Sequence, residues 1–95
     1  MFRYETMFVL RPDLEEEKYE ALIAKFRSII EGQKGEVINL NRMGRRRLAY
    51  EVNKFREGFY LLCNYSGTAN VTNELERNFR ITDEVIRYLI VKENE

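Results

Sequence analysis

Hydrophobic side chains change their spacing along the chain, and each spacing predicts a different element. Residues 4–10 place apolar side chains at every second position, which is typical of a strand, and residues 11–13, Arg-Pro-Asp, end that pattern. Apolar side chains then recur at the spacing of a helix stripe that faces a core. The stripe comprises Tyr19, Leu22, Ile23, Phe26, Ile29 and Ile30. The first third of the chain therefore predicts a strand followed by a helix.

The ends of these elements carry their own signals. Asp13 and Glu16 have the spacing of a capping box, so we expect Asp13 to cap the helix, and Gly32 and Gly35 are expected to end it. An extended segment over residues 36–52 follows, in which Gly44 indicates a bulge or bend.

The remaining elements follow at short intervals. Residues 53–58 are turn-like, and residues 59–66 form a third strand that pairs with the second in a hairpin. Four-residue spacing over 71–79 predicts a shorter helix, and residues 85–91 predict the last strand.

The predicted order is strand, helix, strand, strand, helix, strand. Right-handed crossovers place both helices on one face of a single sheet. This is the α+β, ferredoxin-like split βαβ arrangement, with a four-stranded antiparallel sheet in the order 2-3-1-4. We expect residues 1–95 to form one domain, with the sheet face opposite the helices open to a ligand, a nucleic acid or another protein.

Composition narrows the class of protein. The chain is 44% hydrophobic and 34% charged, as in ordinary globular proteins, and its 16 basic and 16 acidic side chains balance. A nucleic-acid signal must therefore be local. The single cysteine, Cys63, excludes a disulfide within the chain and is expected to be buried. The longest apolar run is residues 59–63, against about 20 residues for a membrane span. We expect a cytoplasmic protein without a membrane segment.

Catalytic motifs are missing from the sequence. There is no histidine, no glycine-rich phosphate loop and no Cys/His spacing for zinc. The acidic side chains of residues 13–20 fall in the first turns of the predicted helix, where they complement its dipole. Acylphosphatase, an enzyme of this general fold, needs a glycine-rich anion cradle after the first strand, and residues 11–13 lack the glycines. We expect no enzyme, no cofactor, no metal site and no small-molecule substrate.

Positive charge gathers between residues 42 and 56. Six basic side chains stand there against one carboxylate, Glu51: Arg42, Arg45, Arg46, Arg47, Lys54 and Arg56. Cations also protect edge strands from aggregation, although lysine usually has that role. Five of these six are arginine, which binds phosphate with two parallel hydrogen bonds, and aromatic side chains are interleaved with them. The segment favours RNA binding. Strand alternation places Arg45 and Arg47 on one face, with Arg46 on the face of Leu48 and Tyr50.

Two other binding modules share this element order. Residues 56–61 partly match the third strand of an RNA-recognition motif. If Leu61, Cys63 and Tyr65 face the helices, only Tyr60 and Leu62 remain on the open face, which is a poor stacking platform. The alternative function is a small-molecule-binding regulatory module of ferredoxin-like fold. Such modules hold their ligand near a glycine-containing loop after the first strand, and residues 11–14 contain no glycine.

The segment Gly44-Arg45-Arg46-Arg47-Leu48-Ala49-Tyr50 resembles the G-x-R-x-LAY signature of the bacterial small-subunit ribosomal protein six family. The resemblance extends over essentially the whole chain. It includes the opening residues 1–5, the proline after the first strand, Lys54, residues 58–60 at the turn and third strand, and residues 83–87 and 91–92 at the last strand.

The resemblance implies a structural constituent of the small ribosomal subunit. Family members have the split βαβ fold and bind the central domain of the small-subunit ribosomal RNA together with ribosomal protein eighteen, their heterodimer partner. Two departures bear on these contacts. Glu51 stands where the family commonly has proline, and the chain stops at residues 92–95 where many members continue, so contacts made by a longer tail are expected to be absent or reduced.

The resemblance and the charge pattern together nominate site residues. We expect RNA contacts from basic and aromatic side chains: Arg3, Tyr4, Arg45, Arg46, Arg47, Tyr50, Lys54, Arg56, Arg87 and Lys92. We expect contacts with the partner protein from Tyr60 and Leu62 on the open sheet face.

Overall fold

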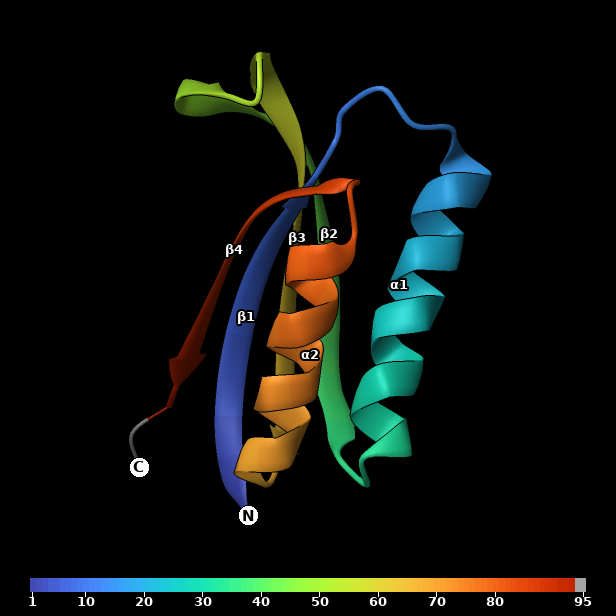
Figure 1. The fold of residues 1–95 in the computed structure, drawn as a ribbon, viewed down its shortest axis with the longest axis vertical. Helices are drawn as coiled ribbons and strands as arrows, with labels where there is room; N and C mark the ends of the chain where they lie inside the picture. Colours follow the sequence, from blue (N-terminus) through green and yellow to red (C-terminus); the bar gives the residue numbers. More distant parts are fainter. Residues whose placement is uncertain (94–95) are drawn as a thin grey trace.

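The computed structural model describes residues 1–93 and contains six elements in the predicted order. They are β1 (Phe2–Leu10), α1 (Glu16–Gly32), β2 (Glu36–Val52), β3 (Phe55–Gly67), α2 (Ala69–Ile81) and β4 (Val85–Lys92). The sheet has the order β2-β3-β1-β4, and every neighbouring pair of strands is antiparallel (Figure 1). The ferredoxin-like split βαβ fold is therefore confirmed. Residues 94 and 95, the end of the predicted domain and of the short tail, lie outside the described residues.

One large core fills the space between the sheet and the helices. Alternate side chains of β1 and β3 point into it, and so does the predicted stripe of α1. Its buried members are Tyr4, Phe8, Leu10, Tyr19, Leu22, Phe26, Ile30, Phe59, Leu61, Cys63, Tyr65, Val71, Leu75 and Phe79. The ring of Phe8 joins the layers, since its centroid lies 5.3 Å from that of Phe26 in α1 and 5.0 Å from that of Phe79 in α2. Both helices therefore cover the same face of the sheet.

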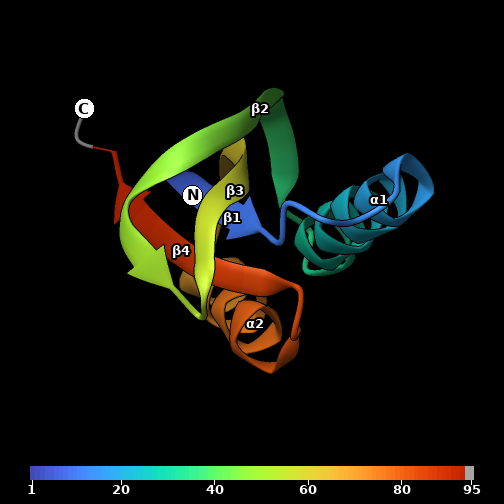
Figure 2. The same cartoon turned by 90° about the horizontal axis from the view of Figure 1, so that it is seen from above.

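The sequence predicts that the face of the sheet opposite the helices is open, but in the structure the hairpin covers part of it. Beyond Gly44, where φ is +83°, β2 curves across the sheet toward β4 (Figure 2). Leu48 is only 6% exposed, because it packs in a second cluster with Val9 of β1 and Ile86 of β4. Alternation alone places Leu48 on this face, but it does not show that the hairpin bends down onto it. The open surface is thus confined to the part of the face that the hairpin leaves free.

The turn between β2 and β3 is shorter than predicted. Only Asn53 and Lys54 form it, with φ of 50° and 70°, and β3 begins at Phe55 rather than at Phe59. A two-residue turn with positive φ at both positions has the twist that the flanking strands need. The sequence over residues 53–58 contains no Asn-Gly pair to signal such a tight turn.

The predicted cap of α1 is wrong. The residue that precedes the helix is Glu15, and its side chain makes no capping hydrogen bond. Asp13 instead accepts hydrogen bonds of 3.2 and 3.0 Å from the guanidinium group of Arg11. This ion pair lowers the pKa of Asp13 and occupies the carboxylate that a cap would use.

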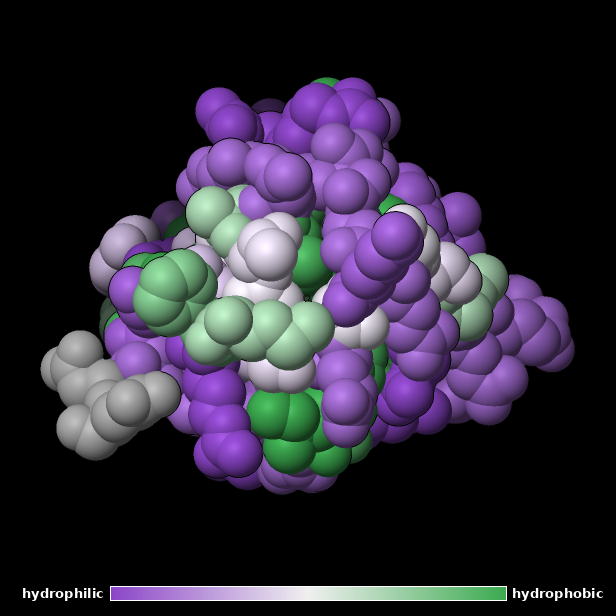
Figure 3. Space-filling view, turned by 90° about the horizontal axis from the view of Figure 1, so that it is seen from below, coloured by the Kyte–Doolittle hydropathy of each residue, from purple (hydrophilic) through white to green (hydrophobic). Residues whose placement is uncertain are grey.

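The end of the molecule that carries the N-terminus exposes apolar side chains. Met1 is 81% exposed and Phe2 is 49% exposed. Seen from that end, hydrophobic and near-neutral residues occupy the centre of the surface and hydrophilic residues surround them (Figure 3). The ammonium group of Lys92 lies 3.6 Å from the ring centroid of Phe2, so this end combines an apolar surface with a single stacked cation.

We predict that stability falls at high pH because of two buried acids. Burial raises the pKa of the Cys63 thiol from 9.0 to about 11 and that of the Tyr65 hydroxyl from 10.0 to about 12. The folded chain keeps the thiol proton where the unfolded chain releases it. The contribution of Cys63 is therefore complete below pH 9 and is lost as the pH rises from 9 to about 11. Urea unfolding across this range should show the decline, and Cys63→Ala should make it shallower. An unchanged slope in Cys63→Ala would contradict the prediction.

We predict that two glycine substitutions act in opposite directions. A Cβ atom at Gly58 would overlap Cγ1 of Val9 in the second cluster, whereas one at Gly32 meets nothing within 4 Å. Gly58→Ala should lower the free energy of unfolding by about 1–3 kcal/mol through overpacking. Gly32→Ala, the matched control, should raise it by about 0.5 kcal/mol because the unfolded chain loses freedom. Chemical denaturation measures both, and equal effects at the two positions would refute the assigned packing at Gly58.

Candidate nucleic-acid interface

The arginine triplet lies in the regular part of the ladder between β2 and β3. Arg45 is paired with Phe59, Arg46 with Gly58 and Arg47 with Glu57. Residues directly opposite in a ladder share a face of the sheet. Arg45 is thus on the side of the helices, where Phe59 is buried, and Arg46 is on the other side. The predicted alternation of the triplet is confirmed.

The basic side chains of the hairpin are exposed. We call residues 45–56 the basic hairpin, and its cations Arg45, Arg46, Arg47, Lys54 and Arg56 are all exposed. Within residues 1–93, none of these five side chains forms a salt bridge. Glu57 lies opposite Arg47, and Glu51 lines the same shallow depression as Arg47 and Arg56. The positive surface is therefore neither covered by a helix nor held in internal ion pairs.

Arg42 behaves differently from the other cations of the segment. Its guanidinium group donates hydrogen bonds of 2.6 and 2.8 Å to the two carboxylate oxygens of Glu16 in α1. It also lies 5.1 Å from the ring centroid of Phe59. The ion pair raises the pKa of Arg42 and lowers that of Glu16. Arg42 thus joins β2 to α1, and we leave it out of the candidate interface.

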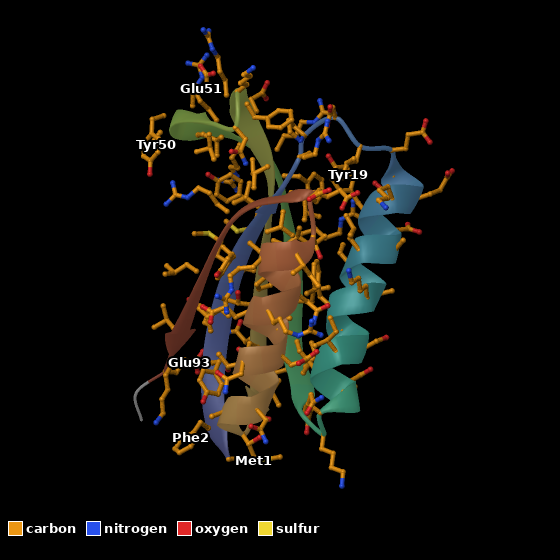
Figure 4. The ribbon with its side chains drawn as sticks, viewed as in Figure 1. Met1, Phe2, Tyr19, Tyr50, Glu51 and Glu93 are labelled. Carbon is orange, nitrogen blue, oxygen red and sulfur yellow. The ribbon has the colours of Figure 1, made fainter. Side chains whose placement is uncertain are left out.

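Tyr50 and Arg87 contact each other across the sheet. Nη1 of Arg87 in β4 donates a 3.1 Å hydrogen bond to the hydroxyl oxygen of Tyr50, and the guanidinium carbon lies 5.4 Å from the centroid of the Tyr50 ring. Tyr50 is nevertheless 63% exposed, and it lies at the tip of the hairpin (Figure 4). The sequence proposed both residues for RNA but gave no indication that they touch.

The prediction that Tyr4 contacts RNA is wrong, because its side chain is buried. It is only 7% exposed, and its ring stacks on that of Tyr65 at a centroid distance of 5.3 Å. It occupies an inward position of β1, the same face as Phe8, so its ring is part of the main core and is not free to stack on a base. The period-two pattern of β1 already places Tyr4 on the inward face with Phe8. That pattern is a better guide to the position of the ring than its ability to stack on a base.

Arg3 and Lys92 lie far from the hairpin. Arg3 pairs with Ser66 at the beginning of β1, and Lys92 pairs with Tyr4 at the end of β4. In Figure 4 the neighbouring Phe2 and Glu93 are at the end of the molecule opposite to Tyr50. The predicted cations therefore form two surfaces, one on the basic hairpin with Arg87 and one near the N-terminus.

The predicted partner contacts lie on the uncovered part of the sheet. Tyr60 and Leu62 are half-buried, on the face opposite the main core. Tyr60 lines a groove whose other lining residues come from β1 and β4: Met7, Val9, Arg87, Tyr88 and Leu89. Leu89 is 57% exposed at the rim of this groove. The groove presents both apolar and polar surface, with Arg87 among its lining residues. Its aromatic and aliphatic side chains are of the kind found in protein interfaces.

Sequence reasoning missed one basic side chain beside the hairpin. Arg11, at the end of β1, has its guanidinium carbon 5.2 Å from the centroid of the Phe55 ring. Its pairing with Asp13 reduces its availability for phosphate. The period-two pattern indicates that β1 ends before Arg11. It does not indicate that Phe55, at the beginning of β3, lies next to Arg11.

The part of the chain that the structure describes offers little to metal binding, membrane insertion or nucleophilic chemistry. Residues 1–93 contain no cluster of three or more His, Cys, Asp or Glu side chains placed to hold a metal ion. Among the helices of that part of the chain, none has the length and apolarity to cross a membrane. The thiol of Cys63 is buried and protonated at neutral pH, so it is not a nucleophile.

Known proteins resemble the chain over nearly its full length. A family model described as Ribosomal protein S6 matches residues 3–92. The small ribosomal subunit protein bS6 of Moorella thermoacetica is 48% identical over 95 residues, which is 100% of this chain and 97% of that protein. The bS6 protein of Clostridium botulinum is 50% identical over 91 residues, which is 96% of this chain and 97% of that protein.

A solved structure of the same family has a fold very similar to that of this chain. The crystal structure of 30S ribosomal protein S6 from Thermotoga maritima has a TM-score of 0.92 at 36% identity, covering 97% of this chain and 87% of that chain. The P2 domain of the chemotaxis kinase CheA, at 13% identity and a TM-score of 0.60, shares only the fold.

The fold and the surface define a ferredoxin-like domain with a basic hairpin at one end and a groove on the sheet face opposite the helices. The matching family model, the related sequences and the similar solved structure identify the family. The chain belongs to the ribosomal protein S6 family. Proteins of this family are structural, non-enzymatic components of the small ribosomal subunit, a cytoplasmic complex, which confirms the predictions about catalysis and location.

We predict that the arginine triplet contributes little to stability. Because Arg45 and Arg47 are exposed and unpaired, the Arg45→Ala, Arg47→Ala double variant should unfold within about 0.5 kcal/mol of the unsubstituted chain. Leu48→Ala, next to them but buried, should cost about 2–4 kcal/mol, because it empties part of the second cluster. Thermal and urea unfolding measure both variants. A large loss in the arginine variant would show that those side chains serve packing.

Proposed function

We propose that this protein is a structural constituent of the small ribosomal subunit that binds the central domain of the small-subunit ribosomal RNA together with ribosomal protein eighteen. The observation that carries the RNA contact is the set of five exposed cations on the basic hairpin, none of them in a salt bridge within residues 1–93. Four of the five are arginines, whose planar groups bind phosphate oxygens in pairs.

The arrangement of the hairpin supports contact with a folded RNA backbone. Arg45 and Arg46 project from opposite faces of the same strand, and Lys54 occupies the turn beyond them. A single flat surface cannot reach all of these cations, whereas a groove or junction of RNA surrounds a protruding hairpin. Phosphate contacts of this kind position a protein on its RNA, while the sequence is read elsewhere.

The groove on the sheet supports a protein partner. Tyr60 and Leu62 lie on the uncovered face, beside the exposed Leu89. Aromatic and aliphatic side chains with few charges are typical of the centre of a protein interface. Arg87 of β4 lines the groove and also contacts Tyr50 of the hairpin. RNA and ribosomal protein eighteen would therefore occupy adjacent surfaces.

RNA affinity should depend strongly on salt. If the hairpin neutralises about four phosphates, log K should fall with log salt at a slope near −3. The Arg45→Ala, Arg47→Ala variant should reduce that slope by about 1.5 in magnitude, since about two contacts are lost. The measurement is a salt titration of binding to a central-domain transcript in the presence of ribosomal protein eighteen.

The matched control removes the same charge from the helices. Arg27→Ala with Arg80→Ala changes two exposed arginines of α1 and α2 and should leave both affinity and slope nearly unchanged. A salt-insensitive affinity, or an equal loss in the control variant, would overturn the proposed RNA contact.

A further inference from the structure

The ladder between β2 and β3 does not by itself fix the tip of the basic hairpin. Pairing is regular from Gly44 and Tyr60 to Arg47 and Glu57, and it resumes only at Val52 and Phe55. Between these pairs, residues 48–51 of β2 stand against Arg56 alone. Such an excess on one strand disrupts the backbone hydrogen bonds and bends the strand. The orientation of the tip must therefore be set by side-chain contacts.

Several contacts hold the tip against the sheet. Leu48 is anchored in the second cluster with Val9 and Ile86, and Val52 and Phe55 pack against that cluster. Tyr50, two residues after Leu48, is held by Arg87 through the hydrogen bond to its hydroxyl and the guanidinium group over its ring. Leu48 fixes the base of the irregular segment, and the contact between Tyr50 and Arg87 fixes its outer part to β4.

The pairing of Tyr50 with Arg87 uses the groups that RNA binding would need. The guanidinium group covers one face of the ring, which reduces the surface on which a base could stack. The donor at Nη1 is directed to the hydroxyl oxygen of Tyr50. Arginine and tyrosine in this arrangement gain both a hydrogen bond and a cation–π attraction.

We propose that Tyr50 and Arg87 form a clasp that positions the tip of the basic hairpin, with its cations Lys54 and Arg56, for RNA, and that they are positioning residues rather than independent RNA contacts. This inference rests on the proposed RNA-binding function. The regular ladder fixes Arg45, Arg46 and Arg47, whereas Lys54 in the turn and Arg56 opposite the irregular segment follow the direction of the tip. A preorganised tip spares the cost of ordering these long side chains and their backbone on binding.

A double-mutant cycle separates a clasp from two independent contacts. Tyr50→Ala and Arg87→Ala should each weaken binding to the central-domain transcript about five-fold, and the double variant by about the same factor rather than about twenty-five-fold. Tyr50→Ala should leave the salt slope unchanged, since it removes no cation. Independent contacts would instead give multiplied losses, and that result would overturn the clasp.

Hydrogen exchange provides a readout that does not depend on RNA. Loss of the clasp should accelerate amide exchange in residues 48–56 several-fold while residues 45–47 and those of β1 stay protected, because only the tip is released. Tyr50→Phe keeps the ring and Arg87→Lys keeps the charge, and both conserve the fold. Tyr50→Phe should show an intermediate effect on exchange. Unchanged exchange in all of these variants would overturn the clasp.

The control for a contact outside the tip is Arg45→Ala in the regular ladder. It should reduce the salt slope by about 0.7–0.9 without coupling to Tyr50→Ala. If the unsubstituted protein does not bind the transcript, the proposed function fails, and the exchange experiment still decides whether the clasp holds the hairpin.

Discussion

Side chains of β1 alternate between the two faces of the sheet, and the two faces contact different parts of the chain. Phe8 and Leu10 point toward the helices, whereas Val9 between them points toward the basic hairpin. The strand is central in the sheet, with β3 on one side and β4 on the other. A shift of one residue in its register would exchange these positions and remove both cores together. The placement of the hairpin thus depends on the same alternation that builds the main core.

Charges are distributed according to what each surface contacts. Near α1, arginine is matched with carboxylate, as in the bidentate pair of Arg42 with Glu16. At the hairpin, arginines are left without a carboxylate partner in the described part of the chain. Exposed ion pairs contribute little to stability, so the protein loses almost nothing by leaving cations unpaired. Unpaired cations remain available for phosphate, whose binding releases counterions.

The sequence predicted most of the fold because period-two and helical spacing are strong in its core elements. It placed Leu61, Cys63 and Tyr65 inward correctly, and it located the bend at Gly44. It failed where one local contact replaces another, or where the sequence carries no signal for the turn that forms. Asp13 has the right spacing to cap α1 but pairs with Arg11, and the turn at Asn53 and Lys54 lacks the residues that usually mark it.

The sequence identified most residues of the candidate site but not the contacts between them. The exposed hairpin arginines and the half-buried Tyr60 were found, because charge and alternation are visible in one dimension. The contact between Tyr50 and Arg87 joins residues 37 positions apart, and the fold of the hairpin onto Val9 and Ile86 joins three strands. Contacts between residues so far apart in the sequence cannot be predicted from the spacing of residues in one sequence. Tyr4 was misassigned for a related reason, since an aromatic residue in a strand serves a core as readily as a base.

The pairing of the first strand with the last has a consequence for synthesis. Tyr4 lies beside Lys92 and Thr6 beside Ile90, so the sheet cannot be completed until β4 has been translated. Until then the emerging polypeptide exposes one edge of β1 together with the apolar side chains that β4 will cover. Contacts between segments far apart in the sequence also slow folding, because the entropy cost of closing a long loop comes before the contacts form. The pairing of β4 with β1 is therefore the step of synthesis that closes this exposed edge.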